Sequence, residues 1–229
     1  MRFTSLLRWD MRFQARYGFY LLYGFLTVLY VILLSAFPPS WKANIAATLI
    51  FSDPAAMGLF FMGAVVLFEK NQRVTSFFAV SPLSAWEYVA SKVLSLSLIA
   101  LLVAAVLAAA ADCTALWSVL LGTILSSVLF TLIGMIIATK ITSLNQFILA
   151  TMPVEILAFV PAILHLAGIT PDFMCIYPAN ACMDLIAHRD FSMTGLILTV
   201  ALIAVLFFIA QQCVQHMWKD EGASCIIQI

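Results

Sequence analysis

Charged residues are scarce in this 229-residue chain: Lys, Arg, Asp and Glu make up only 10% of it. An ordinary soluble domain carries about a quarter. Hydrophobic residues reach 64%, and the mean hydropathy is +1.09. This apolar excess is too large for a soluble core to enclose, so it must face lipid. The formal net charge is zero, so bulk charge indicates no partner, and we expect no nucleic-acid partner.

Catalytic and metal-binding motifs are also missing. The five cysteines form no CxxC or other metal-ligand spacing, so we expect no metal site. There is no G-x-x-x-x-G-K-[ST] phosphate loop, no H-E-x-x-H and no nucleophile motif, which argues against an enzyme and against an ATPase site of its own. The opening MRFTSLLRWDMRFQAR is charged and lacks the pattern of a cleavable signal peptide.

Long apolar runs predict an all-α polytopic membrane protein, because a transmembrane helix needs about 20 mostly apolar residues. Six spans are expected, at 17–37, 45–68, 93–111, 116–139, 147–168 and 195–214. In the second span, Ser52-Asp53-Pro54 is typical of a helix start, so we expect its regular part to begin at Pro54. Segment 169–194 is too polar to span, and we expect short helices at the outer surface there.

The distribution of basic residues predicts the orientation. With six spans both termini lie on one side, and that side carries nine of the eleven Lys and Arg residues. The other side carries only Lys42 and Arg189. We therefore expect cytoplasmic termini. Cys175 and Cys182 would then lie outside, where a disulfide and two free thiols are both open.

Residues 1–16 form a candidate amphipathic helix at the inner interface. Arg8, Arg12 and Arg16 recur every four residues, and the apolar residues fall largely on the opposite side. The alternative is a plain basic anchor that only sets the topology.

The longest loop predicted to be cytoplasmic, residues 67–92, contains a candidate short helix at 74–80. After it, Ser84 and Glu87 have the spacing of a capping box, so the third helix should start near Ala85. A cytoplasmic partner protein that drives movement could bind such a protruding helix. The alternative is an ordinary loop with a chance capping box.

The same region carries a family resemblance. Phe68-Glu69-Lys70, Ser81-Pro82-Leu83-Ser84, Glu87-Tyr88 and Ser91-Lys92 resemble the permeases of ABC-2 type transporters. The opening Asp10, Arg12-Phe13-Gln14 and Arg16-Tyr17-Gly18-Phe19-Tyr20 look like a small six-span subgroup, the fluoroquinolone export permeases. The likeness in layout covers the whole chain as a single permease domain, 1–229.

The resemblance implies a function and partners. The chain would be the membrane subunit of a bacterial inner-membrane exporter of lipophilic or amphipathic substrates, working as a dimer with itself or a homologous permease. Two copies of a separate ATPase would supply ATP and Mg²⁺ chemistry. The 74–80 helix would be the coupling helix, with contact residues Thr75, Ser76, Phe77, Phe78, Val80 and Pro82.

Glu155 is the one carboxylate predicted well inside a span, and an intramembrane acid is a functional candidate. Glu155 and Met152 are candidates for the transport path, and the alternative is a glutamate that joins helices by hydrogen bonds. We expect His165, near the outer end, to be a packing or interfacial residue. Two other functions remain open: a stand-alone secondary transporter, and an intramembrane enzyme using Glu155, His165 and His188.

Overall fold

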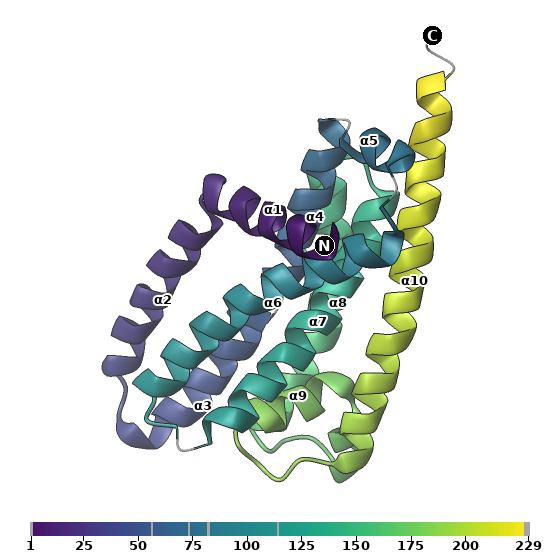
Figure 1. Cartoon of the computed structure of the whole chain (residues 1–229). Helices are drawn as coiled ribbons and strands as arrows, with labels where there is room; N and C mark the ends of the chain where they lie inside the picture. The colour runs from purple at the N-terminus through teal and green to yellow at the C-terminus, as the bar shows by residue number, and fades with distance from the viewer. Residues whose placement is uncertain (1, 56, 73, 82, 114, 227–229) are drawn as a thin grey trace.

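The computed structural model describes residues 2–55, 57–72, 74–81, 83–113 and 115–226, and within these ranges every regular element is a helix. Figure 1 shows the arrangement. The elements are α1 Arg2–Arg16, α2 Phe19–Ser35, α3 Pro39–Ile50, the π-helix η1 Phe51–Ala55, α4 Met57–Asn71, α5 Val74–Val80, α6 Ala85–Ala110, α7 Leu116–Lys140, α8 Leu144–Leu166, the 3₁₀ helix η2 Asp172–Ile176, α9 Pro178–Ile186 and α10 Met193–Ile226.

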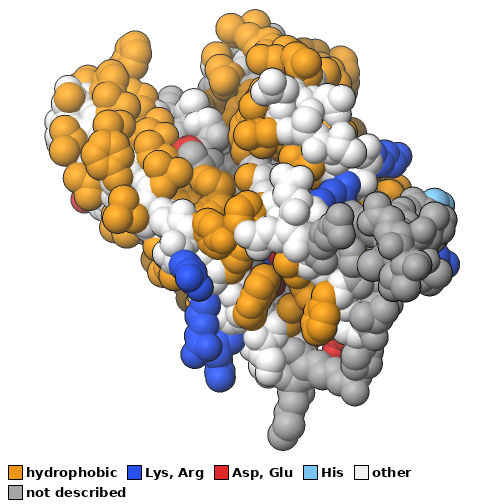
Figure 2. Space-filling view, turned by 90° about the horizontal axis from the view of Figure 1, so that it is seen from above, with side chains coloured by type: hydrophobic (Ala, Val, Ile, Leu, Met, Phe, Trp, Pro, Cys, Tyr) orange, Lys and Arg blue, Asp and Glu red, His pale blue; other side chains and the backbone are white. Residues whose placement is uncertain are grey.

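Within the described chain, five helical segments are long and apolar enough to cross a membrane, and the number is six if the bent pair α1–α2 counts as one span. The all-α polytopic prediction is therefore confirmed. The bundle has two ends: α1 and α5 lie at one, here called the α5 end, and η2 and α9 lie at the other, the α9 end (Figure 1). Seen from the α5 end, hydrophobic side chains cover much of the outside, and Lys and Arg side chains appear among them (Figure 2).

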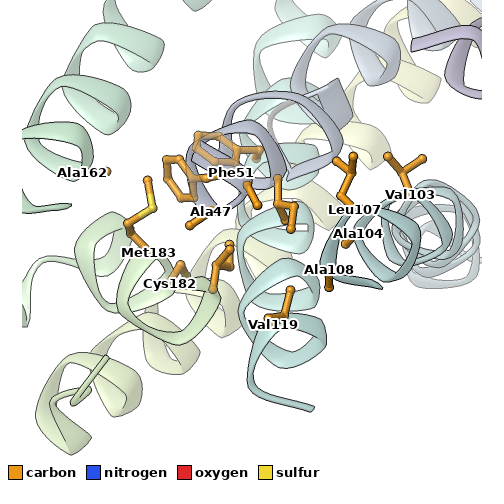
Figure 3. Packing of buried hydrophobic residues seen from close by; sticks show 14 of the residues in the cluster. Ala47, Phe51, Val103, Ala104, Leu107, Ala108, Val119, Ala162, Cys182 and Met183 are labelled. Atoms are coloured by element: carbon orange, nitrogen blue, oxygen red, sulfur yellow. The ribbon is translucent and has the colours of Figure 1, made fainter. Parts of the chain in front are cut away.

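Helix α7 is the centre of the bundle and packs against α4, α6, α9 and α10. Close approach depends on glycines: a Cβ on Gly134 would stand 2.5 Å from the Leu59 carbonyl oxygen, and one on Gly122 would stand 2.9 Å from that of Cys182. Small residues at crossings are the usual way for membrane helices to pack, because lipid provides no hydrophobic drive between them. One of the two buried apolar clusters, shown in Figure 3, joins α3, η1, α6, α7, α8 and α9.

The prediction that a regular helix begins at Pro54 is wrong. Helix α3 runs directly into the π-turn η1, so the second span is one long segment, Trp41–Asn71. The side chain of Asp53 is buried and interacts with Tyr30 of α2. Such π-turns are frequent at functional sites.

Candidate functional site

Helix α5 protrudes at the α5 end, as the sequence predicts, and its residues differ sharply in exposure. Phe77 is 68% exposed, whereas Phe78 is buried. The Phe78 ring lies 5.6 Å from that of Tyr88 on α6 and 6.0 Å from that of Trp218 on α10. The two phenylalanines predicted as contact residues therefore differ: Phe78 anchors the helix, and Phe77 alone of the two is presented outward.

The remaining predicted coupling residues are only partly visible. Thr75 is buried, so its side chain faces the bundle rather than a partner. The side chains of Ser76 and Val80 and the whole of Pro82 lie outside what the structure describes.

The connection from α5 to α6 is fixed by the predicted capping box. The Ser84 backbone N–H donates to Glu87 Oε2 at 3.1 Å, and the Ser84 hydroxyl donates to the same oxygen at 2.6 Å. Trp86, in the first turn of α6, stacks on Phe3 of α1 with ring centroids 6.2 Å apart. Helix α6 therefore begins at Ala85, and its first turn is stabilised by the capping box and by the stacking of Trp86 on α1.

Each residue of the Phe68-Glu69-Lys70 sequence contacts a different element. The Phe68 ring packs edge-on against Phe13 and Tyr17, at the end of α1 and just after it. Lys70 donates through Nζ to the carbonyl oxygens of Ala138, Thr139 and Ile141 at 2.7–3.1 Å. Because the last carbonyls of a helix have no intrahelical partner, this lysine caps the end of α7.

Glu69 belongs to a buried charge cluster, defined here as Asp10, Glu69, Tyr88, Ser91 and Lys92. Lys92 Nζ lies 2.6 Å from Asp10 Oδ1 and 2.5 Å from Glu69 Oε1. The Tyr88 hydroxyl donates to Glu69 Oε2 at 2.6 Å, and the Ser91 hydroxyl donates to Asp10 Oδ2. The cluster joins α1, α4 and α6, and all of its members are buried.

Two further features surround Lys92. The rings of Trp9, Phe13 and Tyr88 lie within 6.0 Å of its ammonium, close enough for cation–π attraction. One helical turn farther along each helix, Gln14 Nε2 of α1 donates to Ser95 Oγ of α6 at 2.9 Å. Arg8, Arg12 and Arg16 are exposed on the other face of α1. The amphipathic helix is thus present, but its inner face carries buried polar contacts as well as apolar ones.

Comparison with known proteins identifies the family of this arrangement. A sequence profile of the fluoroquinolones export permease protein family matches residues 1–220. The chain belongs to this family. A fluoroquinolones export permease protein of Mycobacterium tuberculosis strain H37Rv is 28% identical over 173 residues, which is 75% of this chain and 73% of that protein. The same values hold for the protein of that name in strain CDC 1551. The predicted resemblance is confirmed, and the chain is a transport permease of the membrane.

Glu155 of this export permease is half-buried in the middle of α8. Among the described residues, none forms a hydrogen bond or an ion pair with Glu155, so the structure does not support the alternative that this glutamate joins helices of one chain. Met152, one turn earlier, is 51% exposed. Sequence reasoning missed a second intramembrane acid, Asp53, because its Ser-Asp-Pro context is typical of a helix cap. Asp53 Oδ2 is buried without a partner among the described atoms.

The residues of the predicted enzyme alternative do not converge. Glu155 and His165 are ten residues apart on α8, about 15 Å along its axis. His165 instead contacts Asp184 of α9, with Nε2 3.1 Å from Oδ2. We expected His165 to be a packing or interfacial residue, but it also contacts the buried Asp184. No spacing in the sequence indicates this contact.

Cys175 and Cys182 are both free thiols, which settles the open question of a disulfide within this structure. Cys182 is buried on α9, and burial raises its pKa to about 12. Desolvation disfavours the thiolate, so this thiol stays protonated at neutral pH. The Cys175 sulfur lies 4.0 Å from His165 Nε2 instead.

Proposed function

We propose that this permease is the membrane subunit of an ATP-binding cassette exporter, driven by two copies of a separate ATPase that bind and hydrolyse ATP with Mg²⁺. The ATPase docks on α5 at the cytoplasmic face of a bacterial inner membrane. ATP-driven closure of the ATPase pair moves α5, and through it the transmembrane helices. A second copy of the chain or a homologous permease completes the unit.

The observation that carries the proposal is the way α5 is built. One aromatic side chain, Phe77, points out of the protein with nothing from the described chain covering it. The adjacent Phe78 is wedged between Tyr88 and Trp218, so a force on α5 reaches α6 and α10 directly. The buried charge cluster then links α6 to α4 and α1. An exposed apolar residue on a rigidly mounted helix suits a docking contact.

A path for substrate is supported by the exposure of α8. In the most apolar stretch of α8, only 22% is buried inside the chain. In the corresponding stretch of α10, only 17% is buried. Two apolar grooves flank α8. One, of about 430 Å³, is lined by Trp41, Ile45 and Ile163, and the other, of about 480 Å³, by Leu157, Phe173 and Leu198. We infer that α8, with Glu155 and Met152, faces a second copy across the path.

The substrate class we propose is lipophilic or amphipathic, entering from the bilayer. The grooves beside α8 are lined mostly by apolar side chains, which suit an apolar substrate. Fluoroquinolones are the first compounds to test, because both relatives are named for their export.

The decisive experiment changes Phe77 and leaves its anchor intact. A tagged candidate ATPase is co-expressed with the permease, and its recovery is measured with wild type and with Phe77→Ala. We expect membrane insertion to be unchanged and ATPase recovery to fall by about tenfold or more, since truncating an aromatic anchor costs about 2 kcal/mol or more. Trp117→Ala is the matched control, because Trp117 is also an exposed aromatic residue but lies at the α9 end and lines neither groove.

Undiminished recovery of the ATPase together with normal transport by Phe77→Ala would remove the docking assignment. A stand-alone secondary transporter is the second candidate. It would transport in vesicles that contain no ATPase, with an ion gradient and no ATP. ATP-dependent transport that also requires the ATPase subunit would exclude it.

A further inference from the structure

A cluster of three metal-ligating side chains lies at the α9 end, outside the site described above. His165 stands at the end of α8, Cys175 in η2 and Asp184 in α9. One nitrogen, one sulfur and one oxygen from these residues lie within 4.8 Å of one another. Asp184 is buried, and the other two side chains are half-buried. The three residues span only twenty positions, but no motif spacing relates them.

The chain's turns bring these residues together. Helix α8 ends at Leu166, and Gly168, two residues later, has a φ of +73° that glycine adopts without strain. The chain reverses there, so that the Thr170 hydroxyl reaches His165 Nδ1 at 2.7 Å. Asn180 Nδ2 donates to the Met174 carbonyl at 2.9 Å and holds η2 against α9. A Cβ on Gly195 would meet the Cys175 carbonyl oxygen at 2.6 Å, so η2 also packs closely on α10.

Asp184 is held equally firmly. Gly122 of α7 lets the backbone of α9 approach, and the Ser118 hydroxyl of α7 donates to the Leu185 carbonyl at 2.5 Å. The three side chains therefore come from α8, η2 and α9, and each of these elements is held in place by its own contacts. Side chains positioned in this way lose little freedom when they bind an ion.

The geometry distinguishes an ion site from a catalytic relay. In a Cys–His–Asp relay the thiol and the carboxylate face different nitrogens of the ring. Here both face Nε2: Asp184 Oδ2 at 3.1 Å and Cys175 Sγ at 4.0 Å. The other nitrogen, Nδ1, bonds Thr170 Oγ1, the second-shell contact that orients a metal-bound histidine.

We propose that His165, Cys175 and Asp184 bind Zn²⁺, which fastens η2 and α9 to the end of α8. In a tetrahedral zinc site the ligand atoms stand about 3.3–3.6 Å apart, so closure needs only a small inward movement of Cys175. A thiolate, a carboxylate and a neutral imidazole carry two negative charges, which balance a divalent ion in this partly buried setting. The thiolate disfavours Mg²⁺ and Ca²⁺, and the mixed set suits Zn²⁺. The fourth position is left for water or an oxygen of another ligand.

The test uses the full-length permease in lipid nanodiscs, treated with chelator and then titrated with Zn²⁺. We expect one tightly bound Zn²⁺ per chain by elemental analysis, and thiolate-to-metal charge-transfer absorption when Co²⁺ replaces it. Cys175→Ser and Asp184→Asn should each weaken binding by at least tenfold. Asparagine keeps a hydrogen bond to His165 but loses the charge, so Asp184→Asn separates ion binding from structural bonding. Thr170→Val should weaken binding by about 10–100-fold.

Cys182→Ser and His188→Gln are the matched controls, since they remove the same donor types at the same end without touching the cluster. A second readout needs no variant: bound Zn²⁺ should slow alkylation of Cys175 in the wild type and leave Cys113 unaffected. Binding that survives Cys175→Ser, equal losses in the controls, or a wild type that takes up no Zn²⁺ would each overturn the proposal. None of these measurements depends on the ATPase, so they are independent of the proposed function.

Discussion

Single carboxylates within the membrane are expensive to keep, and Glu155 and Asp53 differ in how the chain accommodates them. Asp53 is buried and interacts with Tyr30 of a neighbouring helix. Glu155 is half-buried on a helix whose outer face is open. Glu155 has no hydrogen-bond partner among the described residues, which makes it a candidate for contact with a second chain, a substrate or water.

Glu155→Gln tests that role. Glutamine has almost the same shape and keeps most of the hydrogen-bonding capacity but loses the charge. We expect assembly with the ATPase to be unchanged and transport of a cationic or zwitterionic substrate to fall about tenfold, because hydrogen bonds to charged groups contribute about 1.5–3 kcal/mol. Transport into inverted vesicles measures it. Val205→Ile, a conservative change at an exposed position of α10, is the control. Equal transport by wild type and Glu155→Gln across several substrates would count against the assignment.

Residue-level prediction from the sequence succeeded where the signal was local. The Ser84–Glu87 box and the exposure of Phe77 and the arginines of α1 follow from nearby spacing. Burial of Phe78 depends on Trp218, 140 positions later, and no local pattern contains that contact. The cluster of His165, Cys175 and Asp184 likewise arises from a turn, a 3₁₀ helix and the docking of α9 on α7.

Helices at the α5 end are joined by buried polar contacts as well as by aromatic packing. Helix α1 lies across α6, and Asp10 and Gln14 of α1 reach Lys92 and Ser95 of α6. Lys92 is shared by two carboxylates, so its loss would leave two buried acids without a cation. Removing one partner of a buried ion pair costs about 3–5 kcal/mol, whereas replacing all partners together is often nearly neutral.

Lys92→Met should therefore lower the stability of the detergent-solubilised protein markedly, by about 3–5 kcal/mol. The triple variant Lys92→Met, Glu69→Gln, Asp10→Asn should recover much of this loss, because its buried groups are all neutral. Thermal unfolding followed by the fluorescence of the tryptophans around the cluster measures both. Lys140→Met, which removes an exposed lysine, is the control and should be silent. A triple variant no more stable than the single one would contradict the electrostatic explanation.

Elements were predicted well wherever a helix is bounded by its own sequence. The 74–80 helix, the start of α6 at Ala85 and the short helices in 169–194 all lie where the sequence indicated. The second span was predicted wrongly at Pro54, because Ser-Asp-Pro caps helices in water. Here the Asp53 side chain turns to Tyr30 on another helix, and the backbone continues through a π-turn. A tertiary contact decided this boundary.

The whole molecule has two unlike ends, and basic residues predict which of them faces the cytoplasm. Gln72 lies exposed at the α5 end, and Trp117, at the start of α7, is exposed at the other. In a version without native cysteines, Trp117→Cys should react with a membrane-impermeant maleimide in intact cells. Gln72→Cys should react only after the membrane is permeabilised, because nine of eleven basic residues lie on its side. The reverse labelling pattern would invert the proposed topology.

The buried charge cluster also dictates an order of events during synthesis. Asp10 and Lys92 are 82 residues apart in the chain. At the usual 5–20 residues per second, the ribosome needs roughly 4–16 s to make the lysine after the aspartate. During that interval α1 has no α6 to receive its carboxylate, and its three exposed arginines favour a position at the lipid headgroups. The α5 end of the permease can therefore close only after α6 has entered the bilayer, so α1, although it is the first helix made, reaches its final position only after α6 is in place.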